Sequence, residues 1–229
     1  MIDNEKLTRW YDVQARFYSS WRDRGTGGHV QQVVASFDAE RPLEIADIGC
    51  GTGLFAVELA AGSATWKITG IDASQGMLDV AADRAKQRQL SNVSWKRGDA
   101  YSLPFADGSF DVVVASGLFP NLNDHNRALQ EFARVLRPEG QLVVVEVDRE
   151  ALRLLDRAFF HTMIFGYRIV STLMPRYKFA RGWSLEKTTV LLGSMVDRLQ
   201  RLGFSVARQE RIDKHWIVSA RFNGNDAQP

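Results

Sequence analysis

The feature that most constrains the fold of this chain is a glycine-rich turn at residues 47–53, Asp-Ile-Gly-Cys-Gly-Thr-Gly. A short apolar run at residues 43–48 leads into the turn and predicts a strand, and residues 54–61 after it have the composition of a helix. Glycine lets a backbone approach a ligand closely, and the first turn of a helix points free N–H groups at that ligand. The sequence therefore predicts a strand, a ligand-binding turn and a helix, the first unit of an α/β fold.

The alternation of strand and helix patterns continues through the middle of the chain. Further strands are predicted at residues 67–71, 93–97, 110–115 and 141–147, with helices after Ser74, a candidate N-cap, and at 126–136. The last two of these strands are valine-rich runs, typical of strands that helices bury on both faces. Successive β-then-α units favour a doubly wound, mostly parallel sheet.

The two ends of the chain carry different patterns. Tyr11, Ala15 and Tyr18 have helical spacing, and glycines follow before a second helical stretch at residues 29–37. After the fifth strand we predict a helical insertion at 150–178, an amphipathic helix at 185–202, and two strands at 205–211 and 216–222 that can pair as a hairpin at the sheet edge.

The whole chain of 229 residues is long enough for one α/β domain with embellishments. We expect N-terminal cap helices (1–40), a ligand-binding core (41–148), a helical lid insertion (149–182), a final helix with strands 6 and 7 (183–222) and a tail (223–229).

Composition limits the classes of function. The 29 Lys and Arg against 27 Asp and Glu give a net charge of +2, so we expect no nucleic-acid partner. The single cysteine, Cys50, cannot form an internal disulfide, and residues 1–6 lack the apolar core of a secretion signal, so we expect a cytoplasmic protein. The four histidines lack metal-ligand spacing, so no metal site is expected.

The spacing of the glycines bears on which nucleotide the turn binds. Dinucleotide dehydrogenases use Gly-x-Gly-x-x-Gly, whereas here Leu54 stands where their third glycine would be. Asp72, at the end of the second strand, can accept hydrogen bonds from both hydroxyls of a ribose, a role common to several nucleoside cofactors. These residues predict a nucleoside ligand without deciding which one.

The order of the motifs resembles that of the class I, Rossmann-like methyltransferases that use S-adenosylmethionine (SAM). The turn is similar to their Asp/Glu-x-Gly-x-Gly-x-Gly loop, and Gly98-Asp99-Ala100 follows the third strand as in that family. Residues 134–140, Arg-Val-Leu-Arg-Pro-Glu-Gly, resemble the family's Arg-x-Leu-Lys-Pro-Gly-Gly, with Glu139 in place of a glycine. The resemblance implies a seven-stranded sheet of order 3-2-1-4-5-7-6, and SAM as the cofactor, released as S-adenosylhomocysteine (SAH).

The N-terminal segment narrows the resemblance. Its sequence Tyr11-Asp12-x-x-Ala15-x-x-Tyr18 is similar to the aromatic helix of the branch that includes the ubiquinone and menaquinone C-methyltransferases and many small-molecule methyltransferases. These enzymes fold that helix over SAM. An alternative role for Tyr11 and Tyr18 is to fasten the helix to the core.

The resemblance assigns residues to each part of the cofactor. The turn would wrap the methionine portion, Asp99 would receive the adenine amino group with Ala100 beside the ring, and Ser116 and Leu118 would line the wall beside the sulfonium. The thiol of Cys50 is interpreted as a small filler rather than a nucleophile. The full expected set is Tyr11, Tyr18, Asp47, Gly49, Cys50, Gly51, Gly53, Asp72, Ala73, Met77, Asp99, Ala100, Ser116 and Leu118.

The acceptor of the methyl group is less clearly specified. The resemblance implies a small apolar, aromatic, quinone-like or natural-product acceptor, methylated at C, O or N. The segment Ser116–Leu122 lacks the two histidines that the branch often carries there, and it differs from the Asn/Asp-Pro-Pro-Tyr/Phe of nucleic-acid amine methyltransferases. His161 and Tyr167 are candidate bases. An NAD-dependent oxidoreductase and a SAM-binding regulatory protein without turnover stay as alternatives.

The insertion also bears on the partners of the protein. Residues 149–181 hold seven Arg and Lys and two acids, a local charge of +5. Their apolar stretch at 158–167 is too short to span a bilayer, which needs about 20 apolar residues. A lid over the pocket is favoured, and contact with the anionic inner face of a membrane is the alternative. A monomer and a homodimer are both compatible with the sequence.

Overall fold

The computed structural model describes residues 4–22, 27–148 and 190–224, with the side chains of 5–15, 28–148 and 190–224. The strands are β1 (Glu44–Ile48), β2 (Lys67–Asp72), β3 (Val93–Arg97), β4 (Phe110–Ser116), β5 (Leu136–Val147), β6 (Phe204–Ile212) and β7 (His215–Phe222). The helices are α1 (Asn4–Arg22), α2 (Gly27–Val34), α3 (Leu54–Gly62), α4 (Gln75–Gln87), α5 (His125–Val135) and α7 (Leu192–Arg201), with a 3-10 turn η2 (Phe119–Asn121).

These strands form one sheet of order β3-β2-β1-β4-β5-β7-β6. Strands β1 to β5 run parallel to one another. Strand β7 lies between β5 and β6 and is antiparallel to both. The doubly wound, mostly parallel sheet and its predicted order are therefore confirmed.

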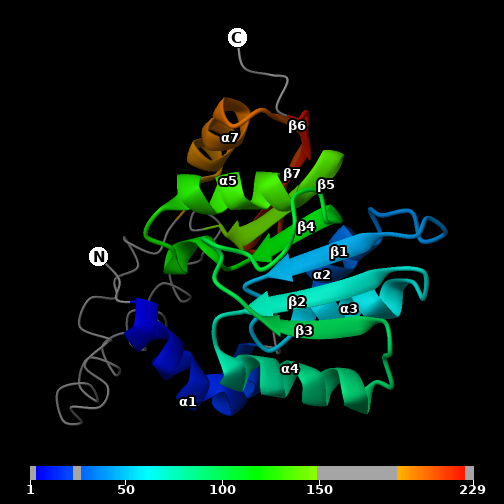
Figure 1. The fold of residues 1–229 in the computed structure, drawn as a ribbon, viewed down its shortest axis with the longest axis vertical. Coiled ribbons are helices and arrows are strands. Elements are labelled where there is room, and N and C mark those ends of the chain that lie inside the picture. The colour runs from blue at the N-terminus through cyan, green and yellow to red at the C-terminus, as the bar shows by residue number, and fades with distance from the viewer. Residues whose placement is uncertain (1–3, 23–26, 149–189, 225–229) are drawn as a thin grey trace.

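Helices cover both faces of the sheet (Figure 1). One core lies between the sheet and α5 with α7, and a second lies between the opposite face and α2 with α3. The side chains of β1 and β4 are almost all buried because they face both layers, which explains their apolar, valine-rich sequences. Edge strands β3 and β6 keep several exposed side chains.

The carboxyl ends of the parallel strands meet at one edge of the sheet, on the left in Figure 1, where α1 also lies. In an open α/β sheet this edge is where ligands bind. None of the helices within the described ranges is long and apolar enough to cross a membrane.

Three elements differ from the sequence prediction by more than one residue at an end. Helix α2 begins at Gly27 rather than His29, because the first turn of a helix needs no partner for its N–H groups and tolerates glycine. It also ends at Val34. Strand β5 begins at Leu136, which pairs with Phe110 before an irregularity in the strand.

The predicted helix at 185–202 is the third case. Residues 185–189 lie outside the described part, and the helix within it begins only at Leu192. Val190 is buried, and its carbonyl accepts a hydrogen bond from the Trp216 indole at 3.2 Å. That contact holds the chain extended just before the helix.

Candidate functional site

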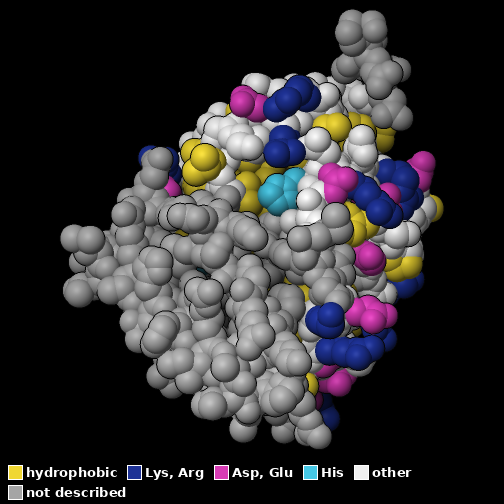
Figure 2. All heavy atoms as spheres, turned by 90° about the vertical axis from the view of Figure 1, so that its left-hand side faces the viewer, with side chains coloured by type: hydrophobic (Ala, Val, Ile, Leu, Met, Phe, Trp, Pro, Cys, Tyr) yellow, Lys and Arg dark blue, Asp and Glu magenta, His cyan; other side chains and the backbone are white. Residues whose placement is uncertain are grey.

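A cleft of about 620 Å³ opens at the carboxyl edge of the sheet, between the strand ends and α1. Figure 2 shows the molecule from this side, and among the coloured residues Lys and Arg side chains lie next to Asp and Glu. Twelve of the fourteen predicted cofactor residues line the cleft: Tyr11, Asp47, Gly49, Cys50, Gly51, Asp72, Ala73, Met77, Asp99, Ala100, Ser116 and Leu118.

One of the four other predicted residues is described and does not line the cleft, and the other three lie wholly or by their side chains outside the described part. Gly53 is absent from the lining of the cleft. The backbone of Tyr18 belongs to α1, but its side chain lies outside the described part. His161 and Tyr167 also fall outside the described residues, as does the whole predicted lid insertion at 149–182.

The glycine turn is fixed by two backbone hydrogen bonds to β2. The N–H groups of Gly49 and Cys50 both donate to the Ile71 carbonyl, at 2.8 and 3.0 Å. Gly49 has a φ of 72°, and a Cβ added to it would lie 2.6 Å from Cδ1 of Leu118. Glycine is needed there for conformation and for space, because the turn touches the wall that follows β4.

Gly53 has a packing role instead of a lining role. It precedes the first residue of α3 with a φ of 76°. A Cβ at this position would lie 2.7 Å from Cβ of Ala81 and equally close to the Trp95 ring. The third glycine therefore lets α3 and α4 approach each other behind the cleft.

Asp47 is the second-last residue of β1, and its side chain is buried. Its Oδ2 accepts a hydrogen bond from the Ala56 N–H, in the first turn of α3, at 3.0 Å. Burial raises the pKa of Asp47 to about 7, opposed by the Ala56 hydrogen bond and reinforced by the charge of Asp72.

Asp72 joins the glycine turn to the start of α4. Its Oδ2 accepts from the Gly51 N–H and its Oδ1 from the Ser74 N–H, both at 2.9 Å. Burial raises the pKa of Asp72, and these two hydrogen bonds oppose the rise. Ser74 caps α4 as predicted, with its hydroxyl accepting from the Met77 N–H at 3.1 Å.

The thiol of Cys50 is buried within the turn. Burial raises its pKa well above the ordinary range, and the charges of Asp47 and Asp72 add to the rise. The thiol is therefore protonated at neutral pH, in agreement with its interpretation as a filler rather than a nucleophile.

The loop after β3 forms the far wall of the same half of the cleft. Asp99 Oδ1 accepts from the Tyr101 N–H at 3.0 Å. The Tyr101 hydroxyl in turn accepts from the N–H groups of Asn123 and Asp124, at 2.7 and 3.0 Å. Tyr101, which lines the cleft, was not predicted because its role depends on a loop distant in sequence.

The contacts of Arg134 explain the arginine that opens the motif at residues 134–140. Its guanidinium donates to the carbonyls of Phe105 and Leu103, at 2.9 and 3.1 Å, and pairs with Glu131 at 2.7 Å. The arginine thus holds the loop that follows Asp99, without touching the cleft itself.

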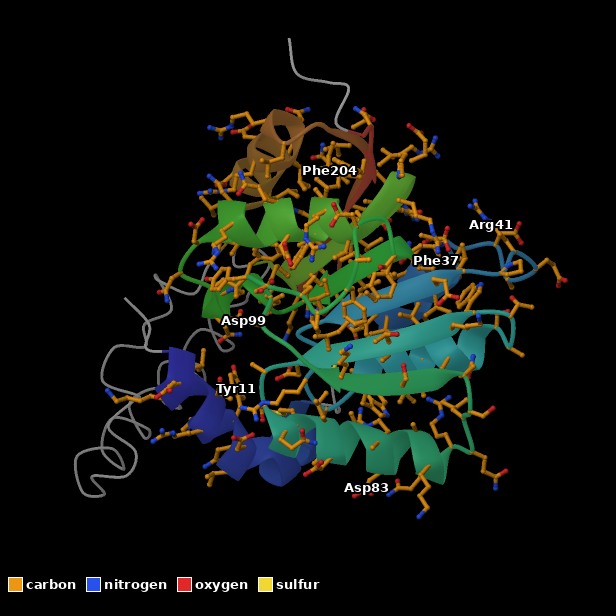
Figure 3. The ribbon with its side chains drawn as sticks, in the orientation of Figure 1. Tyr11, Phe37, Arg41, Asp83, Asp99 and Phe204 are labelled. Atoms are coloured by element: carbon orange, nitrogen blue, oxygen red, sulfur yellow. The ribbon has the colours of Figure 1, made fainter. Side chains whose placement is uncertain are left out.

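Helix α1 closes over the cleft through two adjacent residues. The Tyr11 hydroxyl donates to Asn121 Oδ1 at 3.1 Å. Asp12 Oδ1 accepts from the Ser74 hydroxyl at 2.6 Å and from the Gly76 N–H at 3.0 Å. Figure 3 shows Tyr11 on α1 and Asp99 after β3, both at the edge where the strands end. Tyr11 therefore both lines the cleft and fastens α1.

The other half of the cleft lies over β4, β5 and the start of β7. Its described lining includes Ser116, Gly117, Val145, Glu146, Val147, His29 and His215. Glu146 is buried, and its Oε1 accepts from the Phe119 N–H at 3.0 Å, which shapes the turn after β4. The two histidines stack with ring centroids 3.9 Å apart. Sequence reasoning missed this pair because nothing local links α2 to β7.

The comparisons with known proteins agree with this geometry. A family model described as "Methyltransferase domain" matches residues 46–144. A demethylmenaquinone methyltransferase of Staphylococcus aureus is 31% identical over 190 residues, which are 80% of this chain and 75% of that protein. The chain belongs to the class I SAM-dependent methyltransferases.

A second relative and a solved structure are also similar to this chain. A demethylmenaquinone methyltransferase of Deinococcus radiodurans is 37% identical over 149 residues, covering 65% of this chain but only 60% of that relative. The crystal structure of a SAM-dependent methyltransferase from Aquifex aeolicus has a TM-score of 0.65 at 17% identity, covering 84% of this chain and 89% of that one, and supports the fold. SAM is thus the cofactor of this methyltransferase, and the comparisons do not favour an NAD-dependent oxidoreductase.

Proposed function

We propose that this protein transfers a methyl group from SAM to a small aromatic acceptor that carries a hydroxyl, of the quinol class. The observation that carries the proposal is one continuous cleft with two unlike halves. One half has the acids Asp47, Asp72 and Asp99 at successive strand ends, and the other has Val145, Val147 and two histidines. The names of the two relatives, both demethylmenaquinone methyltransferases, support the acceptor class.

The residues of the first half suit a nucleoside that bears an amino acid and a cationic sulfur. Gly51 leaves open space, since no atom lies within 4 Å of an added Cβ. We assign the Asp72 carboxylate to accept hydrogen bonds from the ribose, the Asp99 carboxylate to accept from the adenine amino group, and Asp47 to accept from the methionine amino group. SAM, when bound, supplies an electrophilic methyl group on a positively charged leaving group.

The remaining work of the chain is to align the acceptor and to exclude water. Gly49 against Leu118 fixes the wall between the two halves. The Tyr11 to Asn121 hydrogen bond holds α1 across the cleft mouth. Alignment of this kind accounts for a large share of the rate of an in-line displacement.

The test is a methyl-transfer assay with tritium-labelled methyl SAM and a chemically reduced demethylmenaquinone that has a short prenyl chain. We expect label in the quinone fraction with the reduced acceptor and none with the oxidised one, which lacks a nucleophilic ring. The Asp72→Ala variant is the control for cofactor-dependent transfer. Absence of labelled product from this quinol and from simple naphthols and phenols would contradict the proposed acceptor class.

Two expectations about partners stay part of this proposal. Contact of the basic insertion at residues 149–181 with anionic lipid predicts cosedimentation with phosphatidylglycerol vesicles, and not with phosphatidylcholine vesicles, that is lost in high salt. A monomer or homodimer predicts one or two chain masses, of 25.8 kDa each, in light scattering.

A further inference from the structure

Two histidines from distant parts of the chain meet in the second half of the cleft. His29 comes from α2 and His215 from the first position of β7. Their rings stack with an interplanar angle of 28° and centroids 3.9 Å apart, and both residues line the cleft. His29 is 3% exposed and also packs against Phe55, whereas His215 is only half-buried. His215 is therefore the ring that is more open to a ligand.

The sheet topology puts this pair on the acceptor side. Strands β1, β2 and β3 end at the acids of the cofactor half, and β4 separates them from β5 and β7. Because β7 is antiparallel to β5, its first residue lies at the edge where the parallel strands end, and His215 pairs with Val147. The histidine pair and the cofactor half therefore lie on opposite sides of β4, the strand that ends at Ser116.

Methylation of a quinol or phenol releases one proton that the site must accept. The acceptor forms a bond to the methyl carbon while the bond from that carbon to sulfur breaks, with its electron pair kept on sulfur as a neutral thioether. For O-methylation the proton comes from the hydroxyl. For C-methylation the hydroxyl proton leaves first and the ring carbon attacks. Loss of the proton on that carbon then restores the aromatic ring, and one proton returns to the oxygen. The net release is one proton in both cases.

We infer that His215 is the catalytic base that takes this proton, and that His29 is a positioning residue that holds the His215 ring by stacking. The inference rests on the proposed function. Imidazole is the side chain that ordinarily changes charge near neutral pH. Two positively charged imidazolium rings stacked at this distance would repel each other.

Other charged groups surround the pair and set its electrostatic environment. Glu146 accepts a hydrogen bond from the Phe119 N–H, and Asp148 pairs with Arg211 at 2.8 Å, so both carboxylates are already engaged. Charged residues near the pair are Asp47 and Glu146 in the cleft lining, Asp148 directly after β5, and Arg211, Asp213 and Lys214 at and beside the turn between β6 and β7.

The first test compares pH–rate profiles of variants with the reduced short-chain demethylmenaquinone. We expect His215→Gln to lower kcat about 10²- to 10⁴-fold and to abolish the fall in rate at low pH, with unchanged SAH affinity. His29→Phe keeps a stacked ring, so it should retain turnover within about tenfold and shift the low-pH limb. The control is His125→Gln, since His125 lies outside the cleft lining and Gln can still donate to the Phe119 carbonyl.

The second test does not depend on turnover. In the SAH-loaded wild-type protein, adding the quinol should shift the imidazole NMR resonances of His215 and His29 and leave those of His125 in place. The inference would be overturned by full activity with an unchanged pH profile in His215→Gln. It would also be overturned if the quinol left the resonances of His215 and His29 unshifted. If the wild type transfers no methyl group to any acceptor, the proposed function fails, and the resonances still decide whether His215 contacts the quinol.

Discussion

The two halves of the cleft are built in different ways. The half over β1, β2 and β3 is rich in carboxylates, each placed at or just after a strand end and held by backbone N–H groups such as those of Ala56 and Gly51. The half over β4, β5 and β7 is formed by valines, a buried glutamate and two stacked histidines from α2 and β7. One half is polar and held by local backbone hydrogen bonds, as suits a fixed cofactor, whereas the residues of the other half are brought together by the strand order.

A substitution at the boundary between the two halves, Gly49→Ala, is expected to have the largest effect on stability and on SAH binding. Gly49→Ala forces a positive φ on alanine, about 1–2 kcal/mol, and drives Cβ into Leu118, another ~1–3 kcal/mol of overpacking. We expect the free energy of unfolding to fall by the sum of the conformational and overpacking costs, and the affinity for SAH to fall as well. Urea denaturation and calorimetry measure both quantities.

A matched pair of variants separates the two costs. Gly49→Ala with Leu118→Ala should recover the overpacking part, and Gly51→Ala, whose Cβ meets no atom within 4 Å, should show the conformational part alone. Equal destabilisation by the Gly49 and Gly51 substitutions would contradict the close contact between turn and wall.

Within the cofactor half, Asp72→Ala removes a carboxylate that binds two N–H groups of the chain. We expect SAH affinity to fall at least about 100-fold, because hydrogen bonds to a charged group are worth ~1.5–3 kcal/mol each. Asp79→Ala, an exposed acid on α4, is the control and should bind SAH normally. Affinity unchanged within threefold in Asp72→Ala would exclude the proposed ribose contact.

The buried charge of the same half predicts a pH dependence of stability. The folded protein keeps the Asp47 proton up to about pH 7, whereas the unfolded chain loses it near 3.8. The folded state therefore binds more protons within this window, and the free energy of unfolding falls as pH rises, by up to about 1.4 kcal/mol per pH unit. Above the folded pKa this contribution is gone.

Asp47→Asn isolates that contribution, since its amide oxygen can still accept from the Ala56 N–H. Urea denaturation from pH 4.5 to 7 should give a flatter pH dependence for Asp47→Asn than for the wild type. Parallel curves would show that the carboxyl is ionised throughout.

A smaller effect is expected where α1 meets the cofactor half. Asp12→Ala removes the acceptor for the Ser74 hydroxyl and the Gly76 N–H, at a cost of ~1 kcal/mol in stability and a few-fold in SAH affinity. Val13→Ala is the control, since Val13 is 71% exposed. Hydrogen exchange in α1 that is the same in both variants would argue against an anchoring role for Asp12.

The smallest effect lies outside both halves. Glu139 replaces the glycine of the related motif and has a φ of 63°, in the region that favours glycine. Its ion pair with Arg221, at 3.7 Å between exposed side chains, offers little compensation. Glu139→Gly should stabilise the protein by ~0.5 kcal/mol, the strain relieved less the added entropy of the unfolded chain, with SAH binding unchanged. Loss of stability would show that the ion pair outweighs the strain.

The two halves of the cleft also differ in how far they could be predicted from the sequence. The turn, Asp72 and Asp99 each follow a strand directly, so local patterns locate them, and the strand order follows from the family resemblance. Gly53 shows the limit of such patterns, because its packing against Ala81 and Trp95 depends on how α3, α4 and β3 meet.

The second half could not be predicted because its residues are joined only by topology. Nothing in the local sequence links His29 on α2 to His215, and only the sheet order, which places β7 beside β5, and the packing of α2 bring the two rings together. The partners Asp12 and Asn121 fall within segments that the sequence singled out, but only the arrangement of α1 over the strand ends gives them their contacts.

The central claim is that the half of the cleft over β1, β2 and β3 holds SAM. Calorimetric titration of the wild-type protein with SAH, in parallel with NAD, tests it most directly. We expect saturable binding of SAH at one site per chain and no heat from NAD. Tight binding of NAD with none of SAH would contradict it.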